Sequence, residues 1–166
     1  MKRQFIIRAM AAVVVMFAAS MNVHAQLEFL NEKNQVIGRI SADGKVTDAQ
    51  GRALGNINPD GKVVDPQGRA LGAINADGSI IGEKNQTISK TTMGKVVGEK
   101  NRELFQISND GKVIAADNKV VATVRGDAKT IKTSMGKTVL SNDEIKNLWT
   151  SAFFIFFEKT IMPLKN

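Results

Sequence analysis

Hydrophobic and polar residues recur along the chain in a unit of about 17 residues. Five clear rows at 34–117 and a less regular sixth at 118–140 follow one another at steps of 17, 17, 17, 16 and 17 residues. The rows begin at Asn34, Gly51, Gly68, Asn85, Asn101 and Asn118. Every row thus begins with Gly or Asn, the residues that most readily adopt a positive φ. Each row start therefore predicts a tight turn with a left-handed residue at a fixed place.

A second turn is predicted further along each row. Four rows share a motif of Ser or Asn, one variable residue, then Asp-Gly: SADGK at 41–45, NPDGK at 58–62, NADGS at 75–79 and SNDGK at 108–112. This order suits a type I turn followed by a left-handed Gly in a G1 bulge. The variants TTMGK at 91–95 and TSMGK at 133–137 keep the Gly and lack the Asp. Each row therefore predicts one small hairpin.

Two apolar columns run through the short strands between these turns. The first column consists of Ile37, Leu54, Leu71, Ile88, Leu104 and Val121. The second consists of Ile40, Ile57, Ile74, Ile107 and Val124, with a gap at Thr91. A single hairpin is marginal alone, so several must stack to bury a common core. The pattern predicts an all-β fold of about five to six repeats, as a closed radial ring or an open β-solenoid. Residues 27–33 are expected to add a lone strand that completes the last sheet.

The C-terminal segment departs from this pattern. Ser141-x-x-Glu144 is a capping-box signature, and apolar residues follow it at helical spacing, which predicts one or two helical turns. These residues are Ile145, Leu148, Trp149 and Ala152. The run AFFIFF at 152–157 predicts a buried strand or plug in the middle of the ring. The alternative is an exposed apolar patch for a partner or a membrane surface, but such a run would favour aggregation.

The first 25 residues have the pattern of a secretory signal peptide. Lys2, Arg3 and Arg8 precede an apolar stretch at 9–19, and Val23-His24-Ala25 resembles a cleavage site. A membrane anchor is the alternative, but this apolar stretch is too short to span a bilayer as a helix. We expect cleavage between Ala25 and Gln26. The expected organisation is a signal peptide at 1–25, a hairpin-repeat domain at 26–140, and a C-terminal helix, strand and tail at 141–166 within that domain.

Removal of the signal peptide would change the net charge of the chain and the residue types that remain in it. The leader carries three of the 23 basic residues and none of the 16 acidic ones, so the net charge falls from +7 to +4. The single His also lies in the leader, and the chain has no Cys and no Tyr. His-dependent nucleophilic catalysis and the usual zinc or transition-metal ligands are therefore not expected. We predict no catalytic residue, metal or cofactor, and no transmembrane segment after cleavage.

The signal peptide, the 17-residue units with ALG and DGKV, and the Phe-rich C-terminal segment resemble the five-fold β-flower proteins of Bacteroidales-type bacteria. The resemblance covers roughly residues 27–157. It implies short β-hairpins around a pseudo-five-fold axis in an exported protein. The family brings no established activity, so no catalytic residue is carried over to this chain.

Basic residues follow both kinds of turn. One set is Lys45, Lys62, Lys95, Lys112 and Lys137, and the other is Arg52, Arg69, Arg102 and Lys119. In a radial fold these residues would form positive rims able to hold an anionic envelope polymer in a salt-sensitive way. The alternative is that they are solvated turn residues whose charges keep strand edges from pairing with other chains.

Asp-Gly turns can also suggest calcium, but the spacing of the Asp residues does not match a calcium loop, and a turn-forming role is preferred. The repeats lack the aromatic residues that stack on nucleic-acid bases, so nucleic acid is not an expected partner. We expect a non-enzymatic structural or binding module of the cell envelope that is periplasmic, surface-exposed or secreted. One alternative is a binder of anionic polysaccharide through the basic turns, and another envelope protein is a further possible partner. The second alternative is a carboxylate-based glycoside hydrolase.

Overall fold

The computed structural model describes residues 27–128 and 140–158. Within these segments, twelve antiparallel strands form one closed barrel in which neighbours in sequence are neighbours in space. The strands are β1 (Leu27–Leu30), β2 (Val36–Ile40), β3 (Lys45–Asp48), β4 (Ala53–Ile57), β5 (Lys62–Val64), β6 (Ala70–Ile74), β7 (Ser79–Gly82), β8 (Thr87–Thr92), β9 (Lys95–Val97), β10 (Glu103–Ile107), β11 (Lys112–Ala115) and β12 (Val120–Arg125). The all-β prediction is confirmed.

Strand β1 closes the ring. It pairs with β2 on one side and with β12 on the other, where Phe29 lies opposite Val124. The expected lone strand after residue 26 is therefore present, and it completes the barrel by joining the two ends of the repeat array. Of the two predicted architectures, the closed ring is confirmed and the open solenoid is wrong.

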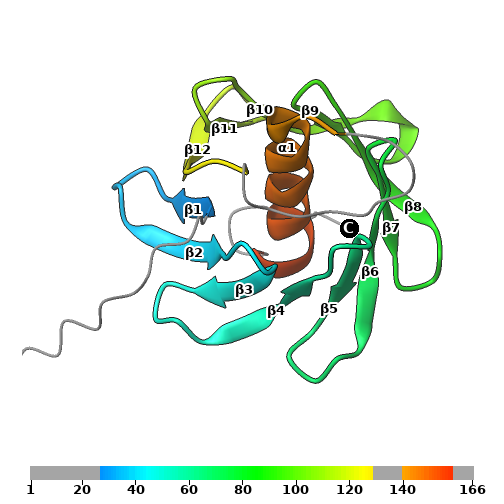
Figure 1. Ribbon diagram of the computed structural model, residues 1–166. Helices are drawn as coiled ribbons and strands as arrows, with labels where there is room; N and C mark the ends of the chain where they lie inside the picture. The colour runs from blue at the N-terminus through cyan, green and yellow to red at the C-terminus, as the bar shows by residue number, and fades with distance from the viewer. Residues whose placement is uncertain (1–26, 129–139, 159–166) are drawn as a thin grey trace, which may run out of the picture.

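Each pair of strands β1–β2, β3–β4, β5–β6, β7–β8, β9–β10 and β11–β12 forms a hairpin that we call a petal. The turn within a petal is its outer turn, and the turn that joins two petals is an inner turn. The petals surround a central helix, and their outer turns point away from it (Figure 1). The described residues thus contain six petals, and the pseudo-five-fold axis is not confirmed.

The first apolar column marks a β-bulge in every petal. In each petal the pairing skips one residue of the second strand, as between Val46 opposite Gly55 and Thr47 opposite Ala53, which leaves Leu54 unpaired. The six skipped residues of the described ring are Ile37, Leu54, Leu71, Ile88, Leu104 and Val121. All six are half-buried and pack against the core. The second column is buried in the barrel, and Thr91 takes the place of an aliphatic residue there.

The turns have the predicted backbone. Every row start has a positive φ, from 56° at Asn101 to 81° at Gly51. The inner turns at 41–44, 58–61, 75–78 and 108–111 end in a Gly with a φ of 84° to 88°, as a G1 bulge requires. The inner turn of the fourth row has only Met93 and Gly94 between paired Thr92 and Lys95, both with positive φ. This two-residue turn explains why that row is one residue shorter.

The centre of the ring is filled by the helix α1 (Asn142–Ala152) and the π-helix η2 (Phe153–Phe157) that continues it. The predicted capping box of Ser141 and Glu144 is present. The helix has 11 residues, which is longer than the one or two turns expected. The four apolar residues that lie at helical spacing are buried: Ile145, Leu148, Trp149 and Ala152.

The prediction of a Phe-rich strand is wrong, because Phe153–Phe157 is helical. The physical reason is the closure of the ring. A closed barrel offers no free edge, so a strand inside it would leave its own backbone groups unpaired. A helix satisfies those groups internally. The expected role of the segment as a central plug is confirmed, since Phe153 and Phe154 are buried and the other three residues are half-buried.

Three glycines make room for this plug. A Cβ atom at Gly38, Gly55 or Gly72 would lie 2.4, 2.6 or 2.7 Å from the ring of Phe153, Phe157 or Phe156, respectively. The last Gly of each GRALG phrase is one of these positions. On another part of the wall the inward residue is Phe105, whose ring packs edge-on against Phe154. The first three rows therefore keep Gly where the phenylalanines approach the wall.

Several predictions lie outside the described residues. These include the signal peptide with its cleavage site at Ala25 and Gln26, the turn at 133–137 with Lys137, and the tail at 159–166. In the described segments, no helix has the length and hydropathy needed to cross a membrane.

Candidate functional site

The outer turns of two neighbouring petals carry the same polar network. In the β3–β4 petal, one carboxylate oxygen of Asp48 accepts hydrogen bonds from the backbone N–H groups of Gln50 and Arg52, both at 2.9 Å. The other oxygen accepts one from Nε of Arg52 at 2.6 Å. In the β5–β6 petal, Asp65 and Arg69 repeat this arrangement with the same three distances. The duplicated D-x-Q-G-R sequence thus builds the same turn twice.

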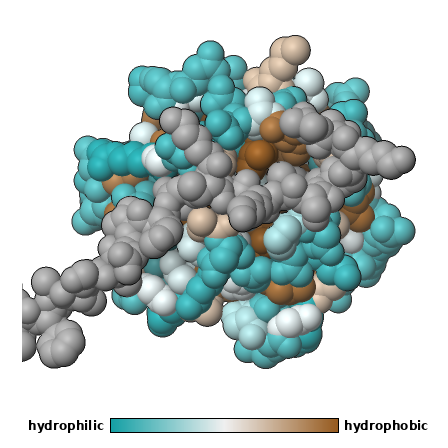
Figure 2. All heavy atoms as spheres, viewed as in Figure 1, coloured by the Kyte–Doolittle hydropathy of each residue, from teal (hydrophilic) through white to brown (hydrophobic). Residues whose placement is uncertain are grey.

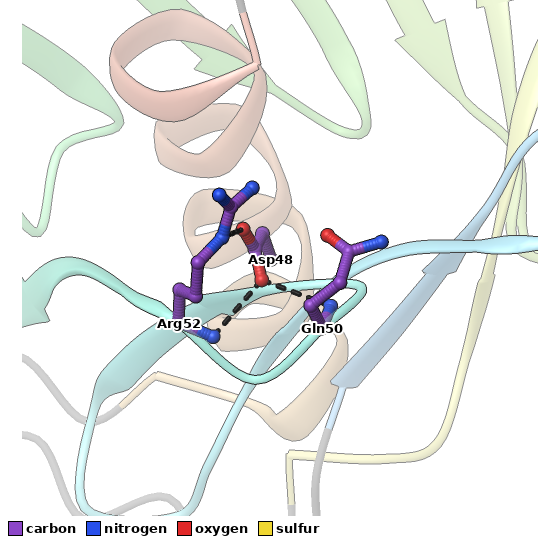
Figure 3. A network of polar contacts seen from close by, with 3 residues as sticks. All are labelled: Asp48, Gln50 and Arg52. Carbon is purple, nitrogen blue, oxygen red and sulfur yellow. Dashed lines mark hydrogen bonds and ion pairs between the residues drawn. The ribbon is translucent and has the colours of Figure 1, made fainter.

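These networks leave the ends of the arginines in solvent. The side chains of Arg52 and Arg69 are each 78% exposed, whereas those of Asp48 and Asp65 are only 15% and 10% exposed. Figure 3 shows the two terminal nitrogens of Arg52 pointing away from Asp48. The carboxylate therefore binds Nε and leaves the two terminal nitrogens as an open guanidinium fork. Hydrophilic residues also cover the petal ends in Figure 2, while hydrophobic residues lie towards the centre.

The carboxylates of this network are held in the charged form. Burial opposes ionisation of Asp48 and Asp65, but hydrogen bonds from the backbone and side chain of Arg52 and Arg69 outweigh it and lower the pKa of each carboxyl. The charge of each arginine also lowers these pKa values. The forks therefore keep their anionic anchors at neutral pH.

The remaining petals vary this turn. In the β1–β2 petal, Asn31 accepts the two backbone hydrogen bonds and pairs with Gln35, which gives an uncharged version of the network. In the β9–β10 petal, Gly98 stands where the Asp would be, so Arg102 has no such anchor. In the β11–β12 petal, Lys119 forms an ion pair with Asp117 at 3.0 Å. Among the described outer turns, the Asp–Arg network occurs only in the two neighbouring petals.

The predicted lysines lie elsewhere. Each begins the strand that follows an inner turn, at Lys45, Lys62, Lys95 and Lys112. Lys95 pairs with Glu103 at 2.7 Å and Lys112 with Asp110 at 2.6 Å. Within the described residues, no carboxylate lies within ion-pair distance of Lys45, Lys62 or Arg102.

The structure thus separates the predicted basic residues into two groups. Arg52, Arg69, Arg102 and Lys119 lie on outer turns, with Arg52 and Arg69 on adjacent ones, and the other described lysines of the prediction lie after the inner turns. Sequence reasoning listed these arginines but missed Asp48 and Asp65 as their anchors. The sequence contains the pattern that indicates this pairing, since Asp and Arg stand four residues apart in both DAQGR and DPQGR.

The Asp-Gly carboxylates serve the inner turns. Asp60 and Asp77 accept the backbone N–H groups of Lys62 and Ser79. Hydrogen bonds from the side chains of Lys112 and Ser108 lower the pKa of Asp110 to about 2. No group of three or more acidic, His or Cys side chains in the described segments is placed to hold a metal ion.

An open pocket of about 250 Å³ lies between α1, the inner turn at 75–78 and the segment 91–94 at the end of β8. Its acidic residues are Asp77 and Glu144. The hydroxyl and backbone of Ser79 lower the pKa of Asp77, and the backbone and hydroxyl of Ser141 lower the pKa of Glu144. A glycosidase acid needs the opposite, a raised carboxyl pKa. The pocket therefore lends no support to the glycoside hydrolase alternative.

Comparison with known proteins gives no relative: no protein-family model, no curated protein and no solved structure matches the chain.

Proposed function

We propose that this chain is an exported, non-enzymatic binding module of the cell envelope that holds an anionic polymer at its outer turns. The observation that carries the proposal is the pair of exposed guanidinium forks of Arg52 and Arg69 on neighbouring petals. Guanidinium groups bind carboxylate and phosphate through two parallel hydrogen bonds, which makes exposed forks suited to polyanions.

The filled interior supports binding at the surface. Many small barrels hold a ligand in their lumen. Here the lumen contains α1 and the phenylalanines of η2, with Trp149, Phe153 and Phe29 fully buried. Ligands would therefore contact turns or outer walls, where Lys45, Lys62 and Arg102, which form no ion pair with another described residue, add to the attraction.

The pKa shifts of the described carboxyl groups argue against a general acid among them. Every described carboxyl with a resolved shift has a lowered pKa: Asp43, Asp48, Asp65, Asp77, Asp110, Asp117 and Glu144. Each of these groups accepts hydrogen bonds within its own turn or cap. Such groups are ionised at neutral pH, so they have no proton to donate there.

The test is co-sedimentation of the purified chain from Gln26 onward with envelope polysaccharide and with lipopolysaccharide, at about 50 and about 500 mM salt, where exposed charges are largely screened at the higher value. We expect retention at low salt, loss at high salt, and loss in an Arg52→Ala/Arg69→Ala variant. The matched control, Lys95→Ala/Lys112→Ala, removes the same charge from two ion-paired residues beside the inner turns and should retain most binding. No retention on either material at low salt would contradict the proposal and favour a structural role or a protein partner.

A further inference from the structure

The two arginine forks are preformed. In solution an arginine side chain samples many rotamers, and ordering it on binding carries an entropic cost. Here the hydrogen bond from Nε to the carboxylate at 2.6 Å fixes each side chain before a ligand arrives. The Asp is itself fixed by two backbone N–H groups. The orientation of the fork is therefore determined by the turn.

The forks lie too far apart for one small anion to bind both. Strands β4 and β5 lie side by side between the two outer turns, so equivalent points on the petals are two strand spacings apart, about 10 Å. The outer turns fan out from the ring, which separates them further (Figure 1). Only an extended ligand with several anionic groups can occupy both forks at once.

The glutamines of the same outer turns indicate which chemical groups the ligand carries between its anionic groups. Gln50 and Gln67 are exposed and belong to the same turns as the forks, and Figure 3 shows the Gln50 amide on the opposite side of Asp48 from the Arg52 guanidinium. An amide both donates and accepts hydrogen bonds, which suits sugar hydroxyl groups. A carboxylate next to hydroxyl groups is the chemistry of a sugar acid.

We infer that Asp48 and Asp65 are positioning residues that hold Arg52 and Arg69 ready for two carboxylates of one acidic polysaccharide chain. This inference rests on the proposed function and specifies its ligand class. Two linked contacts on one chain raise the apparent affinity through effective concentration, without any further contact. Each single contact remains weak and exposed.

The decisive variant is Asp48→Asn/Asp65→Asn, with galacturonic acid oligomers as the probe. Asn keeps the shape and can still accept the backbone N–H groups, but its amide replaces the carboxylate that anchors Nε. The variant gains two positive charges. If net charge alone governed binding, affinity would rise. We expect it to fall about threefold to tenfold for each fork, because the fork must be ordered on binding.

Two controls accompany this titration. Asp117→Asn adds a positive charge at a petal without an arginine fork and should not weaken binding. Thermal unfolding of each variant shows whether the fold is kept. Equal or tighter binding by the folded Asp48→Asn/Asp65→Asn protein would overturn the inference. The same result would still support the proposed function, because the protein would bind the polyanion.

Oligomer length supplies the second measurement. A long oligomer should bind the native protein at least about tenfold tighter than a galacturonic acid dimer. Arg52→Lys or Arg69→Lys alone should remove this advantage, because Lys keeps the charge and loses the fork. The inference would be overturned if the long oligomer still bound tighter than the dimer in each of the two single variants. Binding of a polyphosphate of similar length to the native protein as tight as that of the galacturonic acid oligomer would also overturn it. Absence of binding by every polyanion would instead contradict the proposed function.

Discussion

At the scale of single residues, glycine has two distinct uses in this protein. In the outer turns, Gly51 and Gly68 supply a positive φ and have open space around them. In the inner turns, Gly44 has a similar φ, but a Cβ there would lie 2.0 Å from the carbonyl oxygen of Ile57. The inner turns therefore need Gly for its lack of a side chain as well as for its backbone freedom.

Substitution by alanine separates these two uses. Gly51→Ala should lower the free energy of unfolding by about 1 kcal/mol, the cost of a left-handed backbone for a residue with a side chain. Gly44→Ala adds a backbone clash at a nearly identical φ, and should cost more than about 3 kcal/mol or prevent folding. Urea unfolding of the two variants measures the difference. Equal losses would show that the contact with Ile57 is relaxed in solution.

At the scale of elements, the repeat could be predicted from the sequence because the hairpins share the same types of turn residue. Row starts with Gly or Asn and the Asp-Gly motifs specify their turns locally, whatever the rest of the fold does. The sequence also contains an indication of the bulges. Ile37 and Ile40 are both apolar although they are three residues apart, whereas one face of a regular strand repeats every two residues. The networks of Asp48 and Asp65 likewise follow from a spacing of four residues in the sequence.

The Phe-rich segment could not be assigned from its own residues. A short continuous apolar run has no period, so a buried strand and a buried helix look alike. Its helical form depends on the closure of the barrel by β1, more than 100 residues earlier in the chain. That is tertiary information, and the number of petals likewise depends on how β1 and β12 meet.

The plug should be a main source of stability. Phe153 is fully buried and stacks on Phe29 with ring centroids 3.9 Å apart. Phe153→Ala should lower the free energy of unfolding by about 3–5 kcal/mol, through lost burial and the cavity left behind. Phe157→Ala, at a half-buried position of the same helix, should cost less. Chemical denaturation would measure both, and a larger loss for Phe157 would contradict the observed packing.

At the scale of the whole molecule, many small turns share one electrostatic feature. Their carboxyl groups have lowered pKa values in the folded protein, for example Asp110 at about 2 against an ordinary value of 3.8. A carboxyl with a lower pKa in the folded state stabilises the fold above its unfolded pKa, and this contribution is lost as pH falls through the folded pKa. The contributions belong to separate turns around the ring, so their losses should accumulate.

We therefore expect the free energy of unfolding to fall as pH decreases from about 4 to about 2. The Asp110→Asn variant should show a shallower decrease, because it lacks one of the groups that must be protonated. Urea unfolding across this pH range measures both slopes. A stability that stays constant or rises on acidification would contradict the lowered pKa values of the turn carboxyls.

The most direct test of the account is to observe the two forks during ligand binding. Each arginine has an Nε–H group with its own NMR signal, and a titration with galacturonic acid oligomers would follow these signals together with the backbone amides. The account predicts saturable shifts for Arg52, Arg69 and the amides of their outer turns, with little change at Arg39, which pairs with Glu28 in the barrel wall. Shifts confined to the inner turns around α1, or none at all, would contradict it.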